Sequence, residues 1–136
     1  MREIANQLNI TIIPYPFPND ISGVFFKKDG KLFIGVNESD SEYRQRFTIA
    51  HEIGHCILHP TELLHYDRQE IVHFRAKNLA TPAEVEANYF AAELLMPEER
   101  ILICVNNGIR SISELANRFK VSEEAMEYRL INLGLL

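Results

Sequence analysis

The chain has 136 residues, of which 46% are hydrophobic and 24% are charged, and its formal net charge at pH 7 is −5. This length and composition are typical of one soluble globular domain, so we expect residues 1–136 to fold as a single unit. The acidic balance argues against a surface built for nucleic acid, and no segment is apolar over the length of a membrane span.

The two cysteines, Cys56 and Cys104, lie far apart and match neither a disulfide framework nor a metal-binding cysteine pattern. Free thiols are typical of a reducing compartment, so we expect a cytoplasmic protein. The first ten residues, MREIANQLNI, lack the apolar stretch of a secretory signal, which agrees with this expectation.

The first part of the chain predicts short elements that end in a β-hairpin. Residues 1–9 have a helical pattern, residues 9–13 are β-branched and predict a strand, and three prolines in residues 14–20 predict an extended connector. Residues 21–37 predict the hairpin, because two apolar runs flank Asp29-Gly30, a pair suited to a tight turn with positive φ.

The rest of the chain predicts mainly helices. Ser41 to about His59 has a helical pattern, and residues 60–81 are mixed, with residues 70–75 as a candidate strand. Thr81 and Pro82 are suited to begin a second helix that ends at Pro97. Further helices are predicted at residues 97–108 and, as a pair joined at Val121-Ser122, at residues 111–134.

The stretch AHEIGHCILH, residues 50–59, contains an H-E-x-x-H motif made of His51, Glu52 and His55. On an α-helix, residues four apart face the same side, so both imidazoles can reach one tetrahedral Zn²⁺. Glu52 then lies beside the metal, where its carboxylate can take a proton from water. Gly54 leaves room for another helix to approach closely.

A catalytic zinc needs a third protein ligand, and the second helix supplies three candidate carboxylates. Glu86 borders a face rich in small residues that suits packing against the zinc helix, so we predict Glu86 as the ligand. Glu84, which falls at the capping-box position, and Glu93 remain alternatives. His59 is expected to lie near the end of its helix rather than on the metal. The candidate donors to an oxyanion are His65, Tyr66, His73 and Arg75.

Two blocks, RQRFTIAHEIGHCILH and EVEANYFAAELLMP, resemble the ImmA/IrrE family of zinc metallopeptidases. The resemblance implies an α+β, zincin-like fold, in which a small antiparallel or mixed sheet packs on an active-site helix and on a second, ligand-bearing helix. It also implies that His51, His55 and the glutamate before Ala87-Asn88, here Glu86, bind zinc, and that Glu52 is catalytic. Since about thirty residues separate His55 from Glu86, the register of the third ligand stays open.

The resemblance further implies a bacterial, prophage or mobile-element protein that cleaves a helix-turn-helix repressor. From the site itself, we expect an extended substrate to pair with a sheet edge, for which residues 31–37, KLFIGVN, are the candidate if that strand is not internal. The alternative function is a non-hydrolytic interaction or effector module, such as the effector half of a toxin–antitoxin-like pair, in which zinc is structural.

Residues 111–134 also resemble a helix-turn-helix. The second helix of this pair begins with Ser122-Glu123-Glu124, and Glu127 follows one turn later. Because carboxylates near DNA phosphates are costly, we do not expect direct DNA binding. These helices are expected to close the core or to contact a partner protein.

Overall fold

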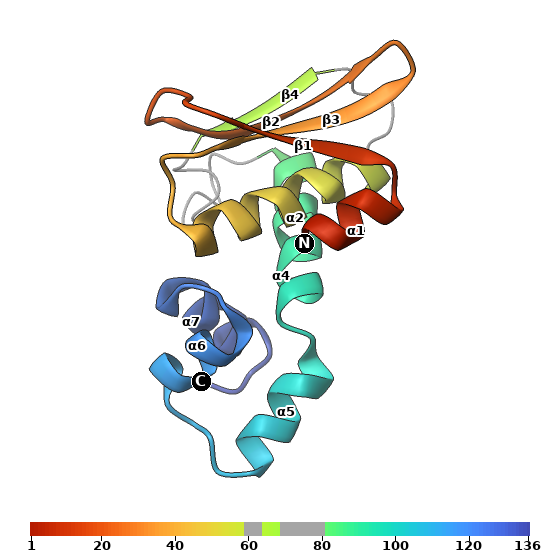
Figure 1. Ribbon diagram of the computed structural model, residues 1–136. Coiled ribbons are helices and arrows are strands. Elements are labelled where there is room, and N and C mark those ends of the chain that lie inside the picture. Colours follow the sequence, from red (N-terminus) through yellow and green to blue (C-terminus); the bar gives the residue numbers. More distant parts are fainter. Residues whose placement is uncertain (59–63, 69–80) are drawn as a thin grey trace.

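The computed structural model describes residues 1–58, 64–68 and 81–136 and has an α+β fold (Figure 1). Among these residues, no helix is long and apolar enough to cross a membrane. In chain order the elements are α1 (Arg2–Gln7), β1 (Ile10–Tyr15), β2 (Ile21–Lys28), β3 (Lys31–Asn37), α2 (Glu42–Leu58), β4 (Leu64–Arg68), α4 (Pro82–Leu95), α5 (Glu98–Asn106), α6 (Ile112–Phe119) and α7 (Glu123–Asn132).

The four described strands form one mixed sheet in the order β1-β3-β2-β4. β1 runs parallel to β3, whereas β2 is antiparallel to both β3 and β4. The hairpin predicted at residues 21–37 is confirmed, and its turn has positive φ at Asp29 (53°) and Gly30 (77°). Both central residues of a tight hairpin turn of this kind need positive φ, which explains the Asp-Gly pair.

Residues 31–37 were a candidate for the free sheet edge, with an internal strand as the alternative, and the structure shows the internal strand. These residues form β3, which pairs with β1 on one side and with β2 on the other. The edge strands of the described sheet are β1 and β4. The sequence pattern of β3 is local, whereas its position in the sheet depends on pairing with the distant strand β1.

Two strand boundaries also differ from the sequence-based expectation. β1 continues through Pro14 to Tyr15, where a connector was expected, and β4 at residues 64–68 was not predicted. Proline lacks an N–H donor but is tolerated on an edge strand such as β1. The candidate strand at residues 70–75 and the expected position of His59 fall outside the described residues.

Helix α2 is enclosed on two sides, as Figure 1 shows: the sheet covers one side, and α4 crosses the other. Nine consecutive residues of α2, from Phe47 to His55, are buried. Ile49 and Ile53 pack with the sheet residues Ile34 and Val36 in one core. On the other side, Phe47 and Ala50 belong to a second core with residues of α4 and the C-terminal helices, namely Ala91, Ala92, Leu95, Met96, Ile101, Leu115, Ala116, Val121, Ala125, Met126 and Leu130.

Two arginines connect the C-terminal helices to the rest of the fold. Nη1 of Arg46 on α2 donates to the carbonyl oxygens of Phe119 (2.8 Å) and Lys120 (3.1 Å) at the end of α6. The buried Arg129 on α7 donates from Nε to the carbonyl oxygen of Met96 at the end of α4 (3.0 Å). Both contacts satisfy carbonyl groups that a helix end leaves without an intrahelical donor.

Candidate metal centre

Helix α2 presents two buried imidazoles on the same side. His51 and His55 lie one turn apart, both are fully buried, and their Nε2 atoms are 3.1 Å apart. Their rings meet edge to face, with centroids 4.7 Å apart. This is the arrangement that the four-residue spacing predicts, because positions i and i+4 of an α-helix are neighbours on one face.

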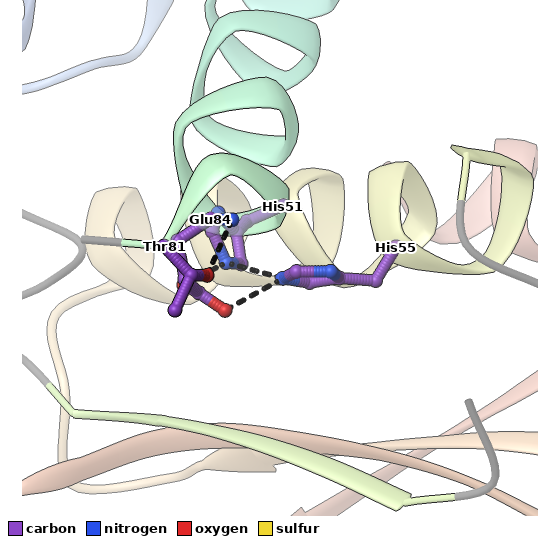
Figure 2. A network of polar contacts seen from close by, with 4 residues as sticks. All are labelled: His51, His55, Thr81 and Glu84. Atoms are coloured by element: carbon purple, nitrogen blue, oxygen red, sulfur yellow. Dashed lines mark hydrogen bonds and ion pairs between the residues drawn. The ribbon is translucent and has the colours of Figure 1, made fainter.

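A carboxylate from the first turn of α4 completes the group (Figure 2). Oε1 of Glu84 lies 3.0 Å from Nε2 of His55, and Oε2 lies 3.1 Å from Nε2 of His51. The predicted N-cap Thr81 is confirmed, since its hydroxyl accepts a hydrogen bond from the backbone N–H of Glu84 (3.2 Å). The cap fixes the backbone of Glu84 while its side chain is directed at the histidines.

These donors fit a metal ion. His51, His55 and Glu84 each offer one ligand atom, and the three atoms lie within 4.8 Å of one another. Neutral imidazole nitrogens and a carboxylate all present lone pairs, and such groups are held close together in a buried site when a cation or shared protons lie between them. Ligand atoms about 2.0–2.1 Å from a tetrahedral zinc would be about 3.3 Å apart, close to the observed spacing.

The structure does not bring Glu86, the predicted third ligand, to the histidines. Glu84 is buried, on the same face of α4 as Ala87 and Ala91, whereas Glu86 is exposed. Successive residues of a helix turn by about 100°, so Glu84 and Glu86 point about 200° apart. The predicted small-residue face does pack against α2, but the carboxylate on this face belongs to Glu84, three residues before Ala87, which the sequence left as an alternative to Glu86.

The other candidate residues are placed in different ways. The Glu93 side chain is 53% exposed and lies 3.5 Å from Arg129, away from the centre. His65 and Tyr66 belong to β4, where their backbones pair with Phe25 and Val24 of β2. His73 and Arg75, the remaining candidate oxyanion donors, fall outside the described residues.

Glu52, the predicted catalytic residue, is fully buried between α2 and the sheet. A Cβ built on Gly23 of β2 would lie 3.8 Å from Cγ of Glu52 and only 2.5 Å from Cγ2 of Thr48. Because a side chain at position 23 would collide with α2, glycine lets the sheet approach this helix closely. Glu52, which directly follows His51 in the chain, is therefore held beneath β2.

Gly54 performs the equivalent role between α2 and α4, the two helices that carry the candidate metal ligands, as its position in the motif predicts. A Cβ at this position would lie 3.0 Å from Cδ1 of Phe90 and 3.3 Å from Cα of Ala87. Both residues belong to α4, so the absence of a side chain at position 54 sets how near Glu84 comes to His51 and His55.

We expect Gly54→Ala to weaken metal binding more than it weakens the fold. The new methyl group would press against α4, at a cost of about 1–3 kcal/mol, of which about 1 kcal/mol is offset by the higher helix propensity of alanine. Metal titration and chemical denaturation of the metal-free chain would measure the two effects. Adding Phe90→Leu should restore part of the metal affinity; if Gly54→Ala alone leaves the affinity unchanged, close helix contact does not position Glu84.

The chain is similar in sequence to a phage protein and to a bacterial metalloprotease. The chain is 34% identical over 97 residues to "Uncharacterized immunity region protein 2" of Bacillus phage phi105, which covers 71% of this chain and 58% of that protein. It is 36% identical over 98 residues to the radiation response metalloprotease IrrE of Deinococcus radiodurans, which covers 70% of this chain and 29% of that protein. The chain thus spans less than two thirds of the length of either relative.

A solved structure titled "Mycobacterium tuberculosis transcriptional regulator" has the same fold, with a TM-score of 0.65 over 95% of this chain and 39% of that one, at 17% sequence identity. The family model described as the IrrE N-terminal-like domain matches residues 5–131, which include both α2, with His51 and His55, and α4, with Glu84. With the resemblance of the two sequence blocks and the relatives' identities, this match shows that the chain belongs to the IrrE N-terminal-like domain family of peptidases.

Proposed function

We propose that the chain is a zinc-dependent endopeptidase that cleaves a peptide bond of a transcriptional repressor. The proposal rests on one observation: the ligand atoms of His51, His55 and Glu84 converge in a buried position. Glu52, which directly follows His51 in the chain, is also buried. Two imidazoles and one carboxylate form a donor set typical of catalytic zinc, which keeps a position open for water or substrate. A structural zinc site would not need a glutamate at position 52.

In the proposed reaction, His51, His55 and Glu84 would hold the metal, whose Lewis acidity would polarise the scissile carbonyl and lower the pKa of water. Glu52 accepts the proton of the attacking water and passes it to the leaving nitrogen. Its burial keeps this carboxylate in one position, so that its proton transfer is not lost to bulk water.

An extended substrate segment would add to a free edge of the sheet through main-chain hydrogen bonds. Of the two edge strands, we propose β4 for this role. It pairs with β2, the strand whose Gly23 comes close to Glu52, whereas β1 lies at the far edge of the sheet. His65 and Tyr66, as members of β4, remain the proposed candidates for an oxyanion donor.

A repressor of the helix-turn-helix class is the proposed substrate. This proposal is supported by the resemblance to ImmA/IrrE proteins and by the relative that is named as a phage immunity region protein. Such regulators act in the cytoplasm, and Cys56 and Cys104 are free, as expected for that compartment.

Removal of the metal should abolish cleavage. The purified chain, incubated with the repressor encoded beside its gene, should yield discrete fragments on a gel and by mass spectrometry. Dialysis against a chelator should reduce the rate by at least about 100-fold, because both polarisation of the carbonyl and activation of water are lost. Stoichiometric Zn²⁺ should restore the rate, and Mg²⁺, which prefers oxygen ligands, should not.

The alternative, a non-hydrolytic interaction module with structural zinc, makes a different prediction. Such a module would bind the repressor and leave it intact, whether or not metal is present. Cleavage that continues unchanged in verified metal-free protein would rule out the zinc peptidase.

A further inference from the structure

A pocket of about 400 Å³ lies away from the metal centre, where α2, the junction of α4 and α5, and the end of α6 meet. Of the eight described residues that line it, four are cationic and none is acidic. The lining residues are Arg46, Leu94, Leu95, Pro97, Arg100, Arg118, Phe119 and Lys120. Four of the chain's 14 lysines and arginines therefore gather around one hollow, in a protein whose net charge is −5.

Three of the four cations in this pocket have no acidic partner among the residues that the structure describes. Arg100, Arg118 and Lys120 are exposed, and no carboxylate in the described parts of the chain forms an ion pair with them. Arg46 uses Nη1 for the carbonyl groups of α6, and its burial lowers the pKa of its guanidinium below the ordinary value. Like charges around a concavity repel one another, so an anion in the pocket would stabilise the arrangement.

We propose that this pocket binds a phosphorylated small molecule. Its volume lies in the range of about 300–1,000 Å³ that is usual for small-molecule sites. Guanidinium groups match phosphate oxygens with paired N–H donors, and three arginines are available here. Leu94, Leu95 and Phe119 supply an apolar wall for the uncharged part of the ligand.

The guanidinium of Arg46 has a fixed position in the pocket, because its two hydrogen bonds hold it between α2 and the end of α6. Arg100 and Arg118 approach from two other helices, α5 and α6, so that a bound phosphate would link three parts of the fold. The pocket also adjoins α4 at Leu94 and Leu95, and α4 carries Glu84 at its opposite end. The site is thus separate from the metal centre but shares both of its helices.

The test is calorimetric titration of the full chain with pyrophosphate and with ATP at constant ionic strength. We expect saturable binding of both probes. The double substitution Arg100→Gln/Arg118→Gln should weaken the affinity at least about tenfold, because a hydrogen bond from a charged donor contributes more binding free energy than one from a neutral donor. The matched control is Lys28→Gln/Lys31→Gln, which removes the same charge at the exposed end of the β2–β3 hairpin. This control should bind as tightly as the wild type to within about twofold.

A His55→Ala chain serves as a second control, because pyrophosphate and ATP also bind metal ions; its affinity should equal that of the wild type. Three results would overturn the proposal. These are the absence of saturable binding by either probe, equal weakening in the arginine and lysine double variants, and binding of a poly-glutamate peptide in place of both phosphate probes. The last result would assign the pocket to an acidic protein segment.

Discussion

Substitution of Glu52 by glutamine is expected to abolish repressor cleavage while zinc stays bound. Glutamine has nearly the same shape but cannot accept the proton of the attacking water. General acid–base groups contribute about 10²–10⁴-fold to a rate, so kcat should fall by at least about 100-fold. The metal content, measured by mass spectrometry, should not change, because Glu52 is not among the three residues whose ligand atoms converge.

The control for this substitution is Glu42→Gln, which removes the same charge from an exposed position in the first turn of the same helix. It should retain the full cleavage rate. Circular dichroism and thermal unfolding would show whether each variant is folded. If Glu52→Gln folds, binds zinc and cleaves at the wild-type rate, Glu52 is not the base and the proposed mechanism is wrong.

The buried position of Glu52 limits which other groups could replace it as the base. The side chain lies under β2, in a part of α2 that has no exposed residue between Phe47 and His55. Glu84, the other buried carboxylate at this site among the described residues, already contacts both imidazoles. Among the residues that the structure describes, no other glutamate is therefore placed to take over the proton transfer.

Features that depend on local chemistry could be predicted from the sequence. The Asp29-Gly30 pair predicts the hairpin turn, since few other residues adopt positive φ easily. The spacing of His51 and His55 predicts that both imidazoles share one face, because the geometry of a single helix decides it. Thr81 predicts the start of α4 for a similar reason, as capping involves only neighbours in the chain.

Features that depend on distant parts of the chain could not be predicted in this way. The inner position of β3 results from parallel pairing with β1, and the five-residue segment LHYDR forms β4 by pairing with β2. Sequence order reveals which strands exist more readily than which strands are neighbours. The same limit applies to the third ligand, because the rotation of α4 about its axis is set by packing against α2 at Gly54.

Because Glu84 and not Glu86 meets the two histidines, Glu84→Gln should lose zinc, and Glu86→Gln should keep it. The two glutamates are two residues apart on one helix, and the substitutions remove the same charge. Removing a residue that only supports a ligand costs about 10–100-fold in metal affinity, so loss of Glu84 as a direct ligand should cost at least about 100-fold. Glu86, which is exposed, should change the affinity by less than about twofold.

Competition between each variant and a chromogenic chelator would measure zinc affinity directly, without any need for substrate. The opposite order, with zinc lost in Glu86→Gln and retained in Glu84→Gln, would mean that the sequence motif identifies the ligand and that α4 is rotated relative to the structure. Retention of zinc in both variants would exclude both glutamates as third ligand. With loss in Glu84→Gln alone, the glutamate three residues before Ala87 becomes the position to compare in related chains, since of the three glutamates of α4 only Glu84 is buried on the face that packs against Gly54.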